Sequence, residues 1–458
     1  MNDMTKGNPL RLILRFAVPL LLGNLLQQFY NIADAAIVGR FLGPDALAAV
    51  GSTGSVQFVI LGFCIGTCTG FCVPITQRFG GKQYPEMRSL LFNSILLTGL
   101  IALIATSSCV LLCKGILRIL SVPENIWANA YIYILIIFAG IPFSLLYNLA
   151  AGILRSVGDS RTPFLVLAVS TVSNIVLDLA CVMVLHMGCA GAALATIMSQ
   201  ALSGFLCTWV IIRKYEILHI RPEERKANRR RIRHLLLTGV PMGLQFSITG
   251  IGGMVLQSAT NSLGSLYASA RTVAGRINML AMCPLDSLSS GVATYCSQNY
   301  GARDYARVRE GVKISTIAAM IYGALTGAVL ILFGRGACLI FLSAKEGQIL
   351  DAAQLLLRRT GYFYVILGLL DIARITVQAL GRSGRAVIAG VMEMVGRAGV
   401  VLLFVPKFGF DAITFADAAA WILADLYIVP VCLMLLRRVK RDLSIPRRTA
   451  GKSARQDY

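Results

Sequence analysis

The sequence Q-R-F-G-G-K-Q-Y-P-E-M-R at residues 77–88 returns in altered form as Q-N-Y-G-A-R-D-Y-A-R-V-R at residues 298–309. Four residue types keep their places across an offset of 221, because Gln77, Gly80, Tyr84 and Arg88 match Gln298, Gly301, Tyr305 and Arg309. The same offset pairs Gly43 with Gly264 and Gly188 with Gly409, and an offset of 222 pairs Pro19 with Pro241. Since this register holds over so much of the chain, we infer an internal duplication in which each half is one structural unit.

The composition is strongly apolar. Of the 458 residues, 56% are apolar or aromatic and only 14% are charged, and the mean hydropathy is +0.70. A soluble domain normally has about 25% charged residues, which supply its hydrated surface. This composition therefore excludes a water-soluble globule and an intrinsically disordered chain, and it indicates that lipid is the solvent.

Twelve apolar stretches are long enough to cross a bilayer as helices, which takes about 20 residues each. They fall near residues 11–39, 46–76, 89–113, 126–150, 164–185, 188–212, 235–260, 266–297, 313–341, 352–380, 386–406 and 411–436. Continuous runs of this length exclude a β-barrel, whose strands are half as long and alternate apolar with polar residues. We predict an all-α polytopic membrane protein with twelve transmembrane helices in two six-helix bundles, related by a parallel pseudo-two-fold repeat because six is even.

The positive charges predict the orientation of these helices. With the N-terminus inside, the cytoplasmic segments hold 31 Lys and Arg residues and the outer segments hold 8, so both termini are expected in the cytoplasm of a multi-pass protein of the cell membrane. The expected parts are an N-terminal lobe (1–212), a basic cytoplasmic linker (213–234), a C-terminal lobe (235–436) and a basic cytoplasmic tail (437–458). The net charge of +21 thus belongs to the flanks of spans, where it suits topology and anionic lipid, and we expect no nucleic-acid partner.

Seven acidic residues fall inside the predicted spans, where each costs about 2.5–3.5 kcal/mol on insertion scales. They are Asp34, Asp178, Asp286, Asp371, Glu393, Asp417 and Asp425. Glu393 has Arg397 one turn away, which predicts a structural ion pair. Asp371 has Arg374 three residues away, and for both pairs contact with a substrate is the alternative to structural pairing or gating.

Asp34 and Asp178 have no basic residue within a turn. An unpaired buried carboxylate either takes up a proton or binds a cation together with neighbouring oxygens. Asn174 lies one turn before Asp178, and with the hydroxyl of Thr196 these residues could supply hard oxygen ligands for Na⁺. The plainer alternative is a pair of protonated acids that hydrogen bond to the backbone.

Several motifs carry a resemblance to a known family. They are P-x-x-x-G-N-x-x-Q-x-x-Y-N-I-x-D from Pro19 to Asp34, V-G-R-x-L-G ending at Gly43, the two Q-x-x-G loops, L-R-S-V-G-D-S-R-T-P from Leu154 to Pro163, and G-C-A-G-A-A-L-A-T from Gly188 to Thr196. Over essentially its whole length the chain resembles the multidrug and toxic compound extrusion (MATE) family of twelve-helix exporters.

The resemblance implies a site as well as a fold. In the branch of the family whose coupling site is in the N-terminal lobe, the matching positions for the cation or proton are Asp34, Asn174, Asp178, Thr196, Tyr133 and Asn148. The positions expected to line the substrate cleft or its gates are Gln27, Tyr30, Asn31, Asp286, Arg276, Asp371 and Arg374. Another branch has an acidic residue on the seventh helix, and residues 235–260 contain none, although Asp371 on the tenth helix leaves a contribution of the C-terminal lobe open.

These features predict a secondary exporter that works by alternating access. Inward flow of H⁺ or Na⁺ would drive efflux of a small amphipathic, often cationic, organic compound from a monomer embedded in lipid. We expect no bound cofactor and no use of ATP, since the chain has no G-x-x-x-x-G-K-[ST] loop. The alternative is a lipid-linked precursor flippase of the same superfamily, which the intramembrane arginines Arg271, Arg276, Arg374 and Arg397 keep open. An enzyme is not expected, since no paired Asp-rich loops and no buried Ser–His arrangement are present.

Overall fold

The computed structural model describes residues 3–120, 122–342 and 346–444, and within them the chain forms helices and no strand. The helices of the first half are α1 (Pro9–Leu42), α2 (Pro44–Gly80), α3 (Tyr84–Ile119), α4 (Glu124–Ala139), α5 (Ile141–Ser156), α6 (Arg161–Leu179), the π-helical turn η1 (Ala180–Val184) and α7 (Gly188–Lys214). Two short 3₁₀ turns follow, η2 (Glu216–Leu218) and η3 (Pro222–Glu224). The helices of the second half are α8 (Arg229–Ser262), α9 (Ser265–Gly301), α10 (Tyr305–Cys338), α11 (Gly347–Tyr362), α12 (Tyr364–Ala379), α13 (Ser383–Leu403), α14 (Val405–Phe408), α15 (Phe410–Ile413) and α16 (Ala416–Ser444).

Two of the predicted spans are broken. In the described part of the chain, nine helices are long and apolar enough to cross a membrane, and the pairs α4–α5 and α11–α12 make two more spans bent by 44° and 55°. The first break falls at Gly140, two residues before Pro142, which has no backbone N–H to continue the helix. The second follows Gly361, where α10 approaches the backbone closely enough to leave no room for a side chain. Both predicted spans are therefore present, each as two helices with a bend between them.

The one predicted span not included in these eleven is α9, which is polar for a transmembrane helix. It has 37 residues, and at 1.5 Å per residue it is about 55 Å long, more than enough to cross a bilayer. It carries Arg271, Arg276 and Asp286 within the span. A polar helix of this length is tolerated in a membrane where neighbouring protein, rather than lipid, surrounds its polar side chains.

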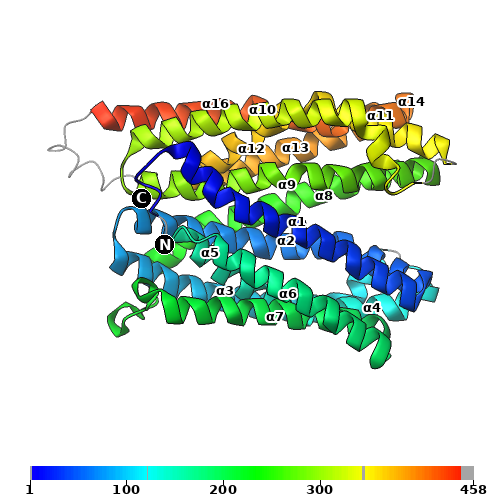
Figure 1. Ribbon diagram of the computed structural model, residues 1–458, viewed down its shortest axis with the longest axis horizontal. Coiled ribbons are helices and arrows are strands. Elements are labelled where there is room, and N and C mark those ends of the chain that lie inside the picture. Colours follow the sequence, from blue (N-terminus) through cyan, green and yellow to red (C-terminus); the bar gives the residue numbers. More distant parts are fainter. Residues whose placement is uncertain (1–2, 121, 343–345, 445–458) are drawn as a thin grey trace.

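The twelve helices form two six-helix bundles, the N-lobe (α1–α7) and the C-lobe (α8–α16), which lie one above the other in Figure 1. Each lobe has its own apolar core. The outer surface is also apolar, because large side chains such as Leu111 and Ile119 are 82% and 86% exposed. Side chains of this kind on the outside of a bundle are suited to contact with lipid.

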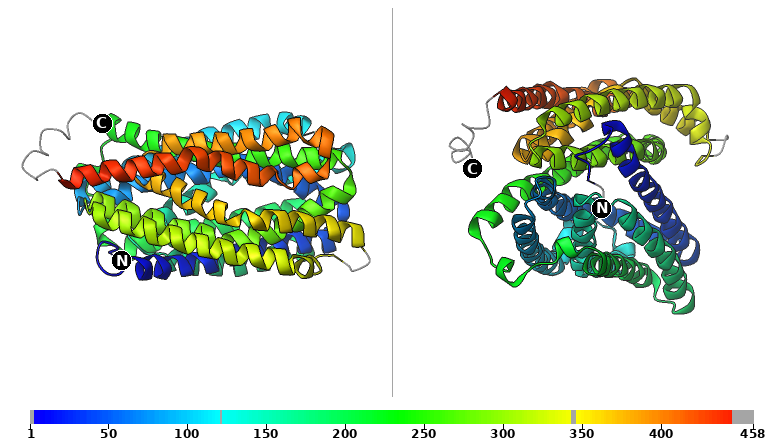
Figure 2. Two further views of the ribbon diagram at one scale, coloured as in Figure 1. Left: turned by 90° about the horizontal axis from the view of Figure 1, so that it is seen from above. Right: turned by 60° about the vertical axis from the view of Figure 1, so that its left-hand side comes forward.

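All connections that are rich in Lys and Arg lie at one end of the bundle. We call this end, where α1 begins and where α2, α5, α7, α9 and α12 end, the basic face, and the opposite end the distal face. The basic face is on the left in Figure 1, and Figure 2 shows the start of α1 at the same end as the last turns of α16. The segment between α7 and α8 is docked there on α3, since Arg88 binds Glu224 at 2.7 Å and Asn93 bonds to the backbone of Lys226 and Asn228.

The lobes touch near the basic face and separate toward the distal face. Gly70 of α2 packs against Gly239 of α8 so closely that a Cβ on Gly70 would lie 2.5 Å from the Cα of Gly239. Nearer the distal face, Gly51 and Gly54 of α2 and Gly253 of α8 have no neighbouring atom within 4 Å of a Cβ position. Figure 1 shows the same divergence, because α1 starts beside the C-lobe at the left and runs away from α9 toward the right. The lobes are therefore in close contact near the basic face, and α1 leaves α9 toward the distal face.

Candidate functional site

The helix α6 buries a polar stripe that leads to Asp178. Ser170, Asn174 and Asp178 follow one another at intervals of four residues, so they lie on one face of the helix, and all three are buried. Ser170 is satisfied, since its hydroxyl donates to the carbonyl oxygen of Ser199 on α7 at 2.7 Å. Directly after Asp178 the helix changes to the π-helical turn η1, a feature that is frequent at functional sites.

Asp34 on α1 and Asp178 on α6 face each other. Their carboxyl groups lie close enough for their charges to interact, and no ion pair involves either one in the described part of the chain. The side chain of Asp178 is fully buried, and three carboxyl oxygens, Oδ1 of Asp34 and both of Asp178, have no hydrogen-bond donor. Two ionised carboxylates can only accept hydrogen bonds. This arrangement thus requires a shared proton or a cation.

Asn174 adds a third unsatisfied group. It is 1% exposed, and neither its Oδ1 nor its Nδ2 has a partner among the described residues. Most buried polar side chains in proteins are hydrogen bonded, so a cluster of two acids and one amide without partners is unusual. The oxygens of this cluster are of the hard type that small cations prefer, and they also suit a proton.

Two tyrosines border the acidic pair. The hydroxyl of Tyr30 donates to Oγ1 of Thr196 at 3.1 Å, because Thr196 uses its own proton on the carbonyl oxygen of Ala192. Tyr133 on α4 lies near Gln57 on α2, and both tyrosines are close enough to Asp34 to interact with its charge. Gln57 in turn donates to Thr53 at 3.0 Å. Thr53 and Gln57 were not among the predicted site residues, although two polar residues four apart in an apolar span indicate a polar face of a buried helix.

The other residues predicted for the N-lobe site lie further from the pair Asp34 and Asp178. Asn148 is 15 residues beyond Tyr133, about 20 Å further along the span, and its amide nitrogen donates to the carbonyl oxygen of Ser144 on its own helix. The structure thus does not bring Asn148 to the acidic pair. Gln27 and Asn31 are half-buried on α1 beside Tyr30.

The C-lobe holds its acids in a chain of ion pairs. Arg374 on α12 lies 2.5 Å from both Asp371 and Glu393, and Arg397 lies 2.8 Å from Asp417. The sequence-predicted pair of Glu393 and Arg397 is 3.6 Å apart, so each has a nearer partner on another helix. Cation and acid alternate along this chain, which is the arrangement expected of buried charges that stabilise one another.

Two further acids border this chain. Asp286 on α9 is close enough to Asp371 and Arg374 for their charges to interact. Both carboxyl oxygens of Asp425 on α16 are buried without a hydrogen bond. Arg276 is exposed and lies ten residues before Asp286, about 15 Å along α9, so these two predicted cleft residues do not meet.

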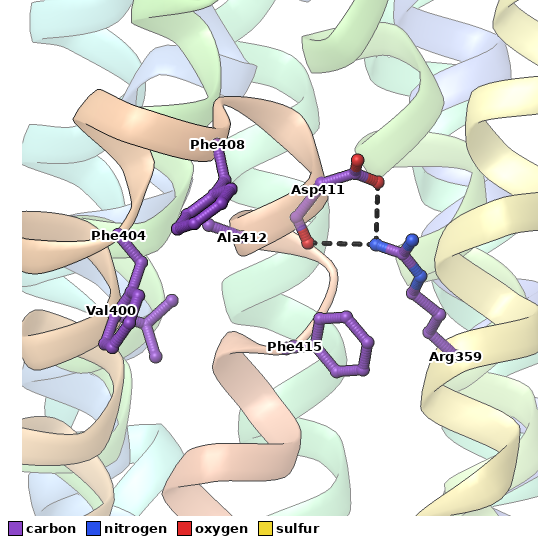
Figure 3. Close-up of a pocket in the computed structure, with 7 residues that line it drawn as sticks. All are labelled: Arg359, Val400, Phe404, Phe408, Asp411, Ala412 and Phe415. Atoms are coloured by element: carbon purple, nitrogen blue, oxygen red, sulfur yellow. Dashed lines mark hydrogen bonds and ion pairs between the residues drawn. The ribbon is translucent and has the colours of Figure 1, made fainter.

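A pocket of about 400 Å³ lies at the distal end of the C-lobe, apart from both acidic clusters (Figure 3). It is lined by Arg359, Val400, Phe404, Phe408, Asp411, Ala412 and Phe415. Arg359 is fully engaged, since it pairs with Asp411 at 2.7 Å and lies over the ring of Phe415 at 4.6 Å. The pocket is apolar and holds no free charge, so it offers no site for a coupling ion.

Comparison with known proteins agrees with this fold. The family model described as MatE matches the chain twice, over residues 19–180 and 241–402. The "Probable multidrug resistance protein YoeA" of Bacillus subtilis (strain 168) is 30% identical over 376 residues, which are 80% of each chain. The "Multidrug export protein MepA" of Staphylococcus saprophyticus is 22% identical, over 95% of this chain and 96% of the relative.

Solved structures give the same result. One described as "Outward-facing conformation of a multidrug resistance MATE family transporter of the MOP superfamily" superposes with a TM-score of 0.89 at 22% identity, over 96% of this chain and 98% of the other. The two family matches begin 222 residues apart, which is the offset that pairs Pro19 with Pro241. The chain, a transporter and not an enzyme, therefore belongs to the MATE family of multidrug efflux transporters.

Proposed function

We propose that this protein exports small amphipathic, often cationic, organic compounds in exchange for H⁺ or Na⁺ ions that enter the cell. The observation that carries this proposal is the pair of the half-buried Asp34 and the fully buried Asp178, whose charges interact and which have no basic partner among the described residues. To act in transport, such a pair has to take up a proton or a cation and release it again. A site that is loaded on one side of the membrane and emptied on the other couples the ion gradient to the movement of the lobes.

The position of the pair supports the direction of transport. Asp34 and Asp178 lie in the distal halves of α1 and α6, and the lobes diverge toward the distal face. The excess of Lys and Arg at the basic face supports a cytoplasmic location of that face, and hence a plasma-membrane protein with both termini inside. In this orientation the described conformation faces outward, so an external ion reaches the pair while a compound leaves to the outside.

The energy available matches such a role. A membrane potential of 100 mV is worth about 2.3 kcal/mol per elementary charge, which sustains a concentration ratio of roughly a few tens for one coupling ion. Na⁺ would be held by the two carboxylates with Oδ1 of Asn174 and the hydroxyl oxygen of Thr196, which retains one lone pair after accepting from Tyr30. A proton would need only the two carboxylates. We expect the monomer to be sufficient, since each lobe contributes its own core.

The alternative function, a flippase for lipid-linked precursors, has little support. It would need free basic side chains in the space between the lobes to hold a pyrophosphate. Arg374 and Arg397 are already paired with acids, and Arg271 lies beside Asp417. Only Arg276, among the four intramembrane arginines, is exposed and outside an ion pair in the described part of the chain.

The test is efflux of a cationic dye from vesicles that contain the purified protein, with a pH gradient or an Na⁺ gradient imposed separately. We expect one gradient to drive dye movement and Asp178→Asn to abolish it. Asp351→Asn is the matched control, since Asp351 is an exposed acid at the distal face that pairs with Arg335. If Asp178→Asn still builds a dye gradient near the wild-type level, the coupling site proposed here is wrong.

A further inference from the structure

Two reciprocal hydrogen bonds join the lobes at the basic face. Gln77 on α2 of the N-lobe donates from Nε2 to the carbonyl oxygen of Ala379, the last residue of α12 in the C-lobe, at 2.8 Å. Gln298 on α9 of the C-lobe donates from Nε2 to the carbonyl oxygen of Ser156, the last residue of α5 in the N-lobe, at 3.1 Å. Carbonyl groups at the end of a helix have no partner within it. Each lobe therefore caps a helix of the other.

The neighbouring glycines let these helix ends meet. A Cβ on Gly80 would lie 2.0 Å from the carbonyl oxygen of Gln298, and a Cβ on Gly301 would lie 1.7 Å from that of Gln77. Any other residue at either position would push the backbones of α2 and α9 apart. Since Gln77 matches Gln298 and Gly80 matches Gly301 in the repeat, the duplicated Q-x-x-G sequence builds one pseudo-symmetric contact between the lobes.

The segment before α1 adds a third connection. The backbone N–H of Met4 donates to Oε1 of Gln298 at 2.9 Å, so Gln298 uses both ends of its amide. The carbonyl oxygen of Met4 accepts from Asn299 at 3.1 Å and from Arg307 at 3.3 Å. Met4 is 1% exposed and packs in the core of the C-lobe, although the helix that follows it belongs to the N-lobe.

We propose that the bonds Gln77–Ala379 and Gln298–Ser156, with the backbone of Met4 against Gln298, form a latch that holds the basic face closed and sets the balance between outward-open and inward-open states. This inference rests on the proposed function only in that alternating access requires the basic face to open. Opening breaks both glutamine bonds at once, while the carbonyl oxygen of Ala379 keeps a second bond, from the hydroxyl of Ser297 in its own lobe at 3.3 Å. A net hydrogen bond of about 0.5–1.5 kcal/mol corresponds to a factor of about two to thirteen in the equilibrium, so loss of both is expected to shift it about tenfold or more.

Hydrogen–deuterium exchange of the full-length protein in detergent tests the latch without transport. In the double variant Gln77→Ala, Gln298→Ala, we expect exchange to become about tenfold faster at the basic-face ends of α2, α5, α9 and α12. Exchange should become slower in the distal halves of α2 and α8, because the distal face closes when the basic face opens. Gln83→Ala is the matched control, since Gln83 lies at the same face but its side chain, among the described residues, bonds only to Arg78 of its own lobe, at 2.7 Å.

Unchanged exchange at the basic face, or equal acceleration at both faces, would overturn the latch. If the double variant does not fold, Gly80→Ala provides the same test by steric means, and it should likewise open the basic face. The latch and the transport function fail separately. An exchange pattern as expected in a protein that moves no dye under any gradient would count against the proposed function and leave the latch in place.

Discussion

The substitution Arg374→Met should destabilise the C-lobe more than any loss of a single acid in the same chain. Arg374 lies 2.5 Å from Asp371 and from Glu393, whose side chains are 7% and 3% exposed. Removing the cation leaves Glu393 with Arg397 at 3.6 Å, but Asp371 loses its only ion-pair partner in the described part of the chain. Breaking a buried pair in this way costs about 3–5 kcal/mol, because the remaining charge is uncompensated.

Losing Glu393 is different because its neighbours keep other partners. In Glu393→Gln, Arg374 still binds Asp371 and Arg397 still binds Asp417 at 2.8 Å, so the expected cost is only that of charge-assisted hydrogen bonds, about 1.5–3 kcal/mol. Adding Asp371→Asn to Arg374→Met removes the stranded acid and should recover most of the loss.

Unfolding in a detergent titration, followed by intrinsic fluorescence, gives the relative free energies of these variants. Arg276→Met is the matched control, since this arginine is exposed and lies in no ion pair among the described residues, and it should unfold like the wild type. Asp34→Asn leaves no cation without a partner, so it should also unfold at the same detergent concentration as the wild type or at a higher one. If Arg374→Met is as stable as Arg276→Met, the chain of ion pairs does not stabilise this lobe and the reasoning fails.

Two further predictions concern the basic face. Hydrogen bonds from Arg88 lower the pKa of Glu224, so this pair stabilises the fold fully above the ordinary glutamate pKa of about 4.3 and loses its effect as the pH falls through the lower pKa of the folded state. The difference in melting temperature between the wild type and Glu224→Gln should therefore shrink from pH 7 to pH 3.5. A difference that stays constant over this range would contradict the pairing. The hydroxyl of Tyr215 donates to Asp159 at 2.5 Å. Tyr215→Phe should therefore lower the free energy of unfolding by about 1.5–3 kcal/mol in the same detergent titration. Tyr84→Phe is the control, since the hydroxyl of Tyr84 makes no hydrogen bond among the described contacts.

The lipid environment, the number of spans and the twofold repeat could all be predicted from the amino-acid sequence. These follow from local properties, because the length of an apolar run and the absence of a basic residue within one turn of Asp34 or Asp178 can be read along a single helix. The stripe of Ser170, Asn174 and Asp178 is equally local, since residues four apart share a face of a helix. A family resemblance then extended this to six site positions.

Contacts between side chains on different helices could not be predicted in this way and became known from the packed structure. Glu393 has its nearest cation on α12 and not one turn away, and Tyr133 lies near Gln57 on α2. Asn148 stays apart from the acidic pair. The rotation and crossing of helices set such contacts, and no periodicity along one segment reports them. For the same reason the repeated Q-x-x-G sequence indicated a duplication but not its use, which became visible once Gln77 and Gln298 were seen to bond to opposite lobes.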